Sequence, residues 1–204
     1  MNKINTIIFD LGGVLIDWNP AYVFDTFFDD EEKKKFFFEN ICTPDWNEQQ
    51  DAGRKIQEAT NDLVALHPGW EEAIRAYYGR WTEMLGGPIT ETVDIFRQLK
   101  NNSTHKFYAL TNWSGELFPI ALDRYDFLKW FDGIVVSGDE KTRKPFPEIY
   151  TTLLSRFNIN PQKALFIDDS LRNIKGAEAL GINCIHFQSA KTLPHQLNEW
   201  GIAV

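Results

Sequence analysis

The sequence has few cysteines, no long apolar run and no excess of basic residues, and each shortage excludes a class of protein. The two cysteines, Cys42 and Cys184, lie far apart and match no metal-binding spacing, so we expect free thiols in a reducing compartment. No stretch approaches the roughly 18 consecutive apolar residues of a membrane span. Lys3 is followed by only a short apolar run that ends at Asp10, which is not typical of a secretory signal. We therefore expect a cytoplasmic protein without a membrane partner.

The charge balance is acidic, because 29 Asp and Glu against 21 Lys and Arg give a formal net charge of −8. No basic stripe offsets this charge, which argues against a nucleic acid as partner, whereas an anionic small molecule can bind where a cation lies in the site. Hydrophobic residues make up 43% of the 204 positions, as in ordinary globular proteins. The length suits one domain, or one domain with an insertion, present as a monomer or a homodimer.

Short apolar segments alternate with segments of about ten residues that show helical periodicity. This alternation predicts right-handed βαβ units, and therefore a doubly wound parallel sheet of the α/β class. A run such as Ile7-Ile8-Phe9, with no alternation of its own, is typical of a strand buried on both faces. The predicted strands are 7–9, 105–111, 132–137, 163–168 and 183–187, and the predicted helices are 90–101, 116–125, 147–157, 171–180 and 193–200.

Residues 17–87 interrupt the alternation with a stretch rich in Phe, Trp, Glu and Lys. Its periodicity predicts helices over 20–28, 54–66 and 69–85, and the acidic-then-basic run 29–35 is expected to be a solvated helix face. We therefore predict a core made of residues 1–16 and 88–204, with residues 17–87 inserted as a helical cap.

Polar side chains stand at the ends of the predicted strands or in the loops that follow them, where open α/β sheets bind their ligands. Strand ends that are far apart in sequence meet at one edge of such a sheet. These residues are Asp10, Thr111, Asn112, Lys144, Asp168 and Asp169.

The carboxylates among them repel one another unless they share a proton or a metal ion. Asp10, Asp168 and Asp169 offer only oxygen ligands, with no His or Cys nearby, and this set suits Mg²⁺. The alternative is that Asp168 and Asp169, followed by Ser170, simply cap the next helix.

The remaining residues suit a phosphoryl group. A lysine fixed at a strand end, as Lys144 would be, can neutralise that group or keep a carboxylate ionised. Thr111 and Asn112 are short hydrogen-bond donors for its oxygens. Asp10 would then be a nucleophile, because carboxylates attack phosphorus to form an aspartyl-phosphate that water hydrolyses.

Four segments in this order resemble the motifs of the haloacid dehalogenase-like (HAD) hydrolase superfamily, whose members are mostly phosphatases. The resemblance covers residues 4–15 and 90–187, and residues 17–87 lie where members with a helical, C1-type cap carry it. It implies a Rossmann-like core, Mg²⁺ as cofactor and a small phosphorylated substrate such as a sugar phosphate. The segments are DLGGVL (10–15), LTNWS (110–114), KTRKPFPEIY (141–150) and FIDDSLRNIKGAEALGI (166–182).

The resemblance also implies a role for each matching residue. Asp10 would be the nucleophile and a Mg²⁺ ligand, Thr111 would bind the phosphate, and Lys144 would orient both. Asp169 would bind the metal directly. Asp168 would be a further ligand or a partner of one, and a polar residue such as Asn173 usually supports the site.

Gly12 departs from the usual pattern, in which a second aspartate two residues after the nucleophile protonates the leaving alcohol and then activates water. Glycine can do neither, although its backbone carbonyl can still bind Mg²⁺. Asp17 is the nearest other acid, and it is a candidate both for the proton donor and for a substrate contact from the cap linker. Further candidate contacts in the predicted cap are Trp18, Asp45, Trp46 and Gln50.

Two other functions fit part of the pattern. A 2-haloacid dehalogenase would use the same Asp10 to attack carbon without a metal, and it would tolerate Gly12 but leave the Asp168–Asp169 pair without a purpose. A non-catalytic member would keep a phosphate pocket after losing the acid at position 12. The joint presence of Asp10, Thr111, Lys144 and Asp169 makes the phosphatase the preferred hypothesis.

Overall fold

The computed structural model describes residues 3–102 and 104–204, and its main sheet is the parallel sheet predicted from the sequence. Within these residues, five strands lie in the order β5-β4-β1-β6-β7. The strands are β1 (Thr6–Phe9), β4 (Lys106–Thr111), β5 (Gly133–Val136), β6 (Ala164–Asp168) and β7 (Asn183–His186). Each begins and ends within one residue of its predicted bounds, and the α/β fold class is confirmed.

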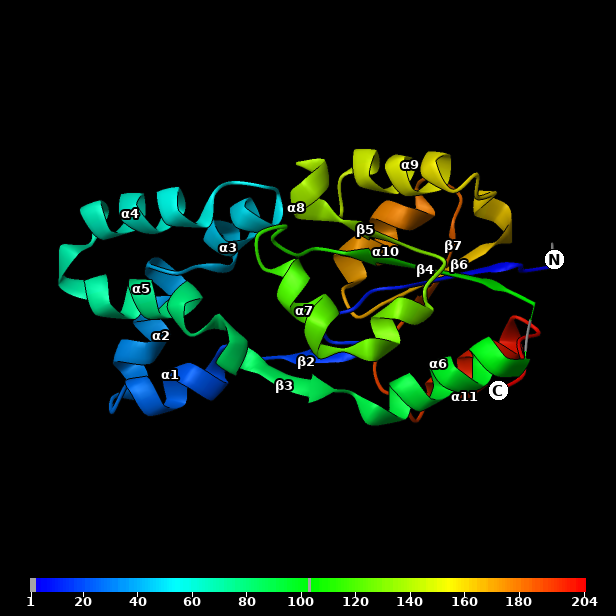
Figure 1. Cartoon of the computed structure of the whole chain (residues 1–204), viewed down its shortest axis with the longest axis horizontal. Coiled ribbons are helices and arrows are strands. Elements are labelled where there is room, and N and C mark those ends of the chain that lie inside the picture. The colour runs from blue at the N-terminus through cyan, green and yellow to red at the C-terminus, as the bar shows by residue number, and fades with distance from the viewer. Residues whose placement is uncertain (1–2, 103) are drawn as a thin grey trace.

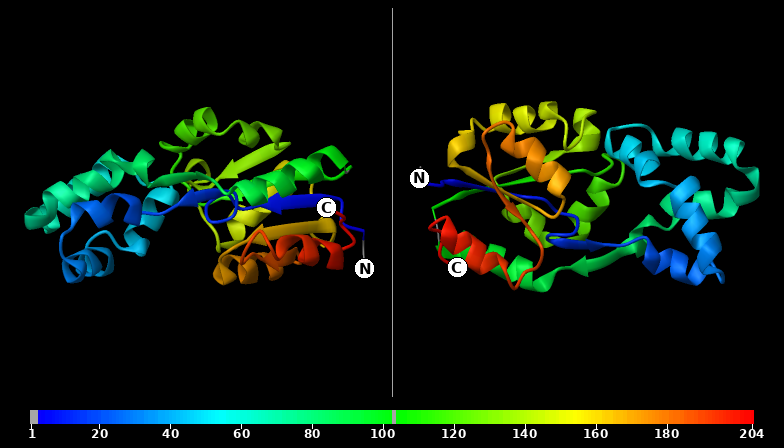
Figure 2. Two further views of the ribbon diagram at one scale, coloured as in Figure 1. Left: turned by 90° about the horizontal axis from the view of Figure 1, so that it is seen from below. Right: turned by 180° about the vertical axis from the view of Figure 1, so that it is seen from behind.

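Helices cover both faces of this sheet (Figure 1, Figure 2). Side chains alternate along β1, so that Ile7 and Phe9 join one hydrophobic cluster while Ile8 joins another on the opposite face. The first cluster includes residues of α6 (Thr90–Asn102), α7 (Phe118–Arg124) and α11 (Leu193–Glu199), and the second includes residues of α9 (Pro147–Arg156) and α10 (Leu171–Glu178). Burial on both faces explains why β1 is a continuous apolar run.

Between β1 and β4 the chain forms a group of helices that lies beside the sheet (Figure 1). An antiparallel pair of short strands, β2 (Ile16–Trp18) and β3 (Leu85–Pro88), joins this group to the sheet. The helices are α1 (Ala21–Phe27), α2 (Glu31–Asn40), α3 (Pro44–Asp51), α4 (Ile56–Leu66) and α5 (Glu71–Gly79), with the 3-10 turns η1 (Pro68–Trp70) and η2 (Trp81–Met84).

Two elements in this group differ from the sequence prediction. The helix predicted over 69–85 ends at Gly79, and Leu85–Pro88 is extended instead, because the Gly-Gly-Pro sequence is a poor helix former and pairs with β2. Helix α3 was not predicted. It begins at a Thr-Pro pair, in which the Thr43 hydroxyl accepts a hydrogen bond from the Trp46 backbone N–H at 3.1 Å.

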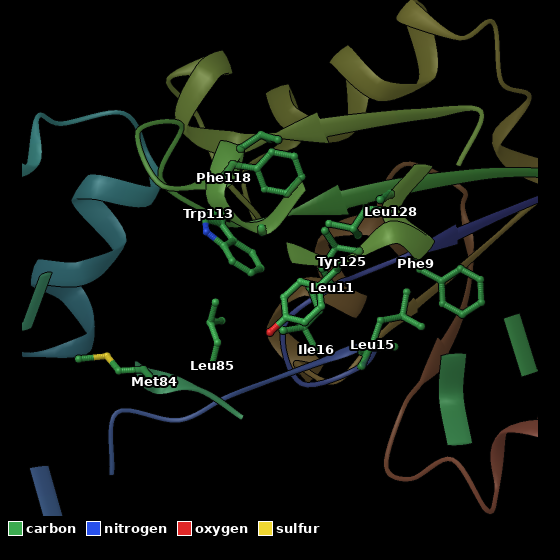
Figure 3. Packing of buried hydrophobic residues seen from close by; sticks show 14 of the residues in the cluster. Phe9, Leu11, Leu15, Ile16, Met84, Leu85, Trp113, Phe118, Tyr125 and Leu128 are labelled. Carbon is green, nitrogen blue, oxygen red and sulfur yellow. The ribbon is translucent and has the colours of Figure 1, made fainter. Parts of the chain in front are cut away.

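One hydrophobic cluster runs from the sheet into the helical group, so the two parts share a core. Figure 3 shows Phe9 of β1 and Trp113, which follows β4, in the same cluster as Met84 and Leu85 from the connection. Three further short elements, η3 (Asp126–Trp130), α8 (Ser137–Glu140) and η4 (Pro161–Lys163), complete the sheet connections. Among the helices of the described residues, none is both long enough and apolar enough to cross a membrane.

Candidate active site

The predicted polar residues meet at the carboxyl edge of the three central strands. β1 pairs with β4 on one side and β6 on the other, and all three run parallel. Asp10 follows β1 directly, while Thr111 and Asp168 are the last residues of β4 and β6. Adjacent strand ends therefore bring together residues that are more than a hundred positions apart in sequence.

Lys144 joins the carboxylates in this cluster. Its side chain is fully buried, and its Nζ lies 2.8 Å from Asp10 Oδ1 and 2.7 Å from Asp168 Oδ2. The amide of Asn112 holds the Lys144 backbone on both sides, accepting from its N–H at 2.8 Å and donating to its carbonyl at 3.0 Å. The strand end at Asn112 thus fixes the loop that carries the lysine, and the Asn112 side chain is engaged with protein.

Burial and charge act in opposite directions on these groups. Burial raises the pKa of Asp10 well above its ordinary value; Lys144 opposes the rise, and Asp168 adds to it. Burial alone would lower the pKa of Lys144, but the two carboxylates outweigh it and raise that pKa instead. The ammonium therefore stays charged in a place closed to water.

The third carboxylate, Asp169, completes a site with ligands that fit a hard cation. One oxygen from each of Asp10, Asp168 and Asp169 lies within 4.8 Å of the others, and all are carboxylate oxygens. Gly13 has a φ of +73° and the Asp169 side chain packs against it so closely that a Cβ there would collide with it. The glycine therefore makes room for this carboxylate.

The two neighbouring aspartates differ in their surroundings. Asp168 is fully buried and its Oδ1 accepts from the Ser170 N–H at 2.8 Å and from Asn173 Nδ2 at 3.1 Å. Both Asp168 oxygens are thus engaged by protein groups, since Oδ2 contacts Lys144. Asp169 is exposed, so its carboxylate is open to a ligand.

Thr111 is buried, and its hydroxyl has no hydrogen-bond partner within the described part of the chain. A buried hydroxyl without a hydrogen-bond partner lowers the stability of the folded state. Such a group is typical of a site where a ligand supplies the hydrogen bond. Thr111 ends β4, beside the end of β1 that Asp10 follows, and this place fits the predicted contact to a phosphate.

Gly12 lies in the wall of a cavity between the sheet and the helical group. A Cβ built on Gly12 would meet no described atom within 4 Å, so the space that an aspartate side chain would fill is open. Trp18 lines the same cavity, as do Trp81 and Trp113. Aromatic side chains therefore form part of the cavity wall beside the position where the usual second acid is missing.

The other predicted contacts lie elsewhere. Asp17 is in β2, where its carboxylate accepts from the Tyr22 hydroxyl at 2.5 Å, and Trp46 is buried against Tyr77 and Tyr78. Neither Asp17 nor Trp46 is among the described residues that line the cavity beside Gly12. Their roles in substrate binding stay predictions.

Gln50 and Asp45 have separate places on α3. The Gln50 side chain is buried inside the helical group and donates to the Trp46 carbonyl at 2.6 Å. Asp45 is exposed and lines a second hollow, to which Trp18 also contributes.

Sequence reasoning missed Asp51, the last residue of α3, which lines the cavity beside Gly12. Two signals mark it in the sequence. The Thr43-Pro44 pair starts a helix, and an aspartate at the other end of that helix opposes the helix dipole, which favours cations there. A residue in an unfavourable local position is a candidate for a functional one.

Fold and site together define an α/β enzyme that gathers carboxylates and a buried lysine at the ends of its central strands. Residues 4–181 match the family model of the haloacid dehalogenase-like hydrolases. The chain belongs to this family and is a hydrolase, which confirms the resemblance of the four motifs.

Several relatives of known sequence or structure are similar to the chain. The sesquiterpene phosphatase astK of Aspergillus oryzae is 29% identical over 192 residues, which is 94% of each chain. A phosphorylated carbohydrates phosphatase of Thermotoga maritima is 36% identical over 78 residues, 38% of this chain and 34% of that protein. A HAD family enzyme of Bacteroides thetaiotaomicron, crystallised with magnesium and inorganic phosphate, is 25% identical with a TM-score of 0.70, covering 95% of this chain and 98% of its own.

Proposed function

We propose that the protein is a Mg²⁺-dependent phosphatase that hydrolyses a small phosphorylated metabolite through an aspartyl-phosphate on Asp10. The observation that carries the proposal is the buried Lys144 ammonium between Asp10 and Asp168, with the Asp169 carboxylate beside them. A dehalogenase needs no metal and gives this acidic cluster no task. Phosphoryl transfer needs both a carboxylate nucleophile and concentrated positive charge.

Each residue has a place in this reaction. Asp10 attacks phosphorus, Lys144 favours the ionised form of that carboxylate and offsets charge on the phosphoryl oxygens, and the Thr111 hydroxyl donates to one of them. Asp169 and Asp10, with the Gly12 carbonyl, hold Mg²⁺. Asp168 orients Lys144 and is a further ligand or a partner of one.

Magnesium, when bound to these oxygens, supplies positive charge against the charge that develops on the transferring group. The magnesium and phosphate in the related Bacteroides structure support this choice of cofactor.

Residues 17–87 act as the cap in this proposal, over a core made of residues 1–16 and 88–204. The cavity beside Gly12 has walls from both parts, which supports a cap that selects the substrate and excludes water. The relatives act on terpenoid and carbohydrate phosphates by their names, so both classes, sugar phosphates included, belong in a substrate panel.

The test measures phosphate release from sugar phosphates, isoprenoid monophosphates and p-nitrophenyl phosphate, with Mg²⁺ or with EDTA. We expect turnover only with Mg²⁺, and a loss of about a thousandfold or more in Asp10→Asn. Asp123→Asn, which removes an exposed carboxylate on α7, is the matched control and keeps the wild-type rate.

Two outcomes would contradict the proposal. Chloride release from 2-chloropropionate without metal, together with no phosphate release, indicates a dehalogenase. Saturable binding of inorganic phosphate with no turnover of any substrate in the panel indicates a non-catalytic binding protein.

A further inference from the structure

The cavity beside Gly12 has one acidic side chain among the described residues that line it, and that side chain is Asp51. Gly12 comes from the loop after β1, whereas Asp51 is the last residue of α3 in the proposed cap. Since a Cβ on Gly12 would meet nothing within 4 Å among the described atoms, no side chain fills the space on the Gly12 side. The cavity therefore pairs the missing acid of position 12 with a carboxylate from another part of the chain.

The Asp51 carboxylate is held in place by hydrogen bonds. Asn47 Nδ2 donates to its Oδ2 at 3.1 Å, and the nearby backbone N–H of Ser114 favours the ionised form of the carboxyl and lowers its pKa. The Tyr78 hydroxyl donates to Asn47 Oδ1 at 2.9 Å, which fixes the amide with its nitrogen toward Asp51. Asn47, Tyr78 and Ser114 themselves line the cavity.

The backbone of Asp51 is tied to the core of the protein. The fully buried Ser137 hydroxyl donates to the Asp51 carbonyl at 2.5 Å and accepts from the Trp113 N–H at 2.9 Å. Gly53 lies against Gly138, the residue after Ser137. A Cβ on Gly53 would approach the Gly138 carbonyl oxygen to 2.7 Å. These contacts fix the end of α3 against the loop that follows β4 and the start of α8, which follows β5.

The surroundings of Asp51 keep a proton near neutral pH. Burial raises the pKa of its carboxyl to about 7, and the neighbouring Glu48 adds to the rise. Arg143, the Ser114 N–H and Lys144 oppose it. The charged and titratable groups that face Asp51 are Glu48 of α3, Arg143 and Lys144 from the loop before α9, and Tyr77 and Tyr78 of α5.

We propose that Asp51 is the general acid and base of the phosphatase reaction, in place of the carboxylate that position 12 lacks. This inference rests on the proposed function. In the first step the Asp10 oxygen bonds to phosphorus, the bond from phosphorus to the leaving oxygen breaks, and the leaving oxygen takes the Asp51 proton to become an alcohol. In the second step Asp51 takes a proton from water as the water oxygen bonds to phosphorus, and the Asp10–phosphorus bond breaks to release phosphate.

The test compares phenyl phosphate with p-nitrophenyl phosphate, which have similar size but leaving groups of different basicity. Nitrophenolate leaves without a proton, whereas phenolate gains much from one. We expect Asp51→Asn to lower kcat/KM at least about a hundredfold for phenyl phosphate and less than about tenfold for p-nitrophenyl phosphate. For wild type, kcat/KM on phenyl phosphate falls as the pH rises through about 7, where Asp51 loses its proton, and Asp51→Asn lacks this fall.

A second measurement tests the base role. With p-nitrophenyl phosphate, Asp51→Asn should release about one nitrophenol per active site in a burst and then turn over slowly. The second phase is slow because water attacks the phosphorylated Asp10 without a general base. Ser137→Ala, which removes the bond to the Asp51 carbonyl and the bond accepted from the Trp113 N–H, should show the same dependence on the leaving group with a smaller loss. Glu58→Gln, at an exposed acid on α4, is the control.

The outcomes separate the two proposals. A wild-type protein that hydrolyses neither ester and no other substrate of the panel contradicts the proposed function and the role of Asp51 together. The role of Asp51 alone is overturned if the wild type is active and Asp51→Asn lowers kcat/KM by the same factor for both esters. It is also overturned if kcat/KM of Asp51→Asn on phenyl phosphate still falls as the pH rises through about 7. If Asp51→Asn does not fold, Ser137→Ala provides the test. A larger loss of kcat/KM for phenyl phosphate than for p-nitrophenyl phosphate supports the role of Asp51, and equal losses overturn it.

Discussion

Lys144 carries its charge where water does not reach it. The side chain is fully buried, and its ammonium is stabilised by Asp10 and Asp168 on two sides. Removing one partner from a buried ion pair typically costs about 3–5 kcal/mol, because the remaining charge is left unpaired. The three groups therefore form one unit, in which the lysine opposes the rise in the pKa of Asp10 and holds its carboxylate in position.

Thr111 provides a test at the same scale, because stability and activity should change in opposite directions. Its hydroxyl is buried without a partner in the part of the chain that the structure describes, a state that costs about 1–3 kcal/mol. We expect Thr111→Val to raise the free energy of unfolding, measured by urea denaturation. Its kcat/KM for a phosphate ester should fall about ten- to a hundredfold, since a hydrogen bond to a charged group is lost.

Two results would contradict this account of Thr111. If the valine variant is less stable than wild type, the hydroxyl has a structural partner. If its kcat/KM is unchanged, the hydroxyl does not contact the substrate.

At the scale of elements, the strands and their ends could be predicted, but the docking of α3 could not. Ile7-Ile8-Phe9 is apolar because β1 is covered on both faces, so the sequence marks the strand, and the aspartate after it marks the edge of the sheet. In α3 the buried residues are Trp46 and Gln50, which give no amphipathic pattern. The neighbours of Asp51 across the cavity depend on tertiary contacts, which local periodicity does not contain.

The contact between Gly53 and the β5–α8 junction makes a prediction about this docking. Gly53 has a φ of +94°, and a Cβ there would lie 2.7 Å from the Gly138 carbonyl oxygen. We expect Gly53→Ala to lower the free energy of unfolding by about 1–3 kcal/mol and to reduce kcat/KM, because the end of α3 must move away from the core.

Gly69→Ala is the matched control for this substitution. A Cβ on Gly69 would meet no described atom within 4 Å, and the residue belongs to η1, far along the chain from the docking contact. Urea denaturation and steady-state kinetics should leave this variant close to wild type. If the two substitutions change the free energy of unfolding and kcat/KM equally, the close approach of Gly53 to Gly138 does not determine how α3 docks.

The whole molecule is acidic, and the cations near the site are paired with carboxylates. The formal net charge of −8 repels an anionic substrate at long range, but screening limits this effect to about 8 Å at physiological ionic strength. Near the site, Glu48 of α3 forms ion pairs with Arg143, at 2.5 Å, and with Arg172. These pairs link α3 to the loop before α9, which carries Arg143, and to α10, which carries Arg172.

The central claim is that Asp10 becomes phosphorylated during turnover. The most direct measurement quenches the protein with acid during turnover of a phosphate ester and Mg²⁺, reduces it with borohydride, and identifies modified peptides by mass spectrometry. An acyl phosphate is reduced to the alcohol, so we predict homoserine at position 10 only when substrate was present. Phosphate release without modification of Asp10, or with homoserine at another aspartate, would contradict the account.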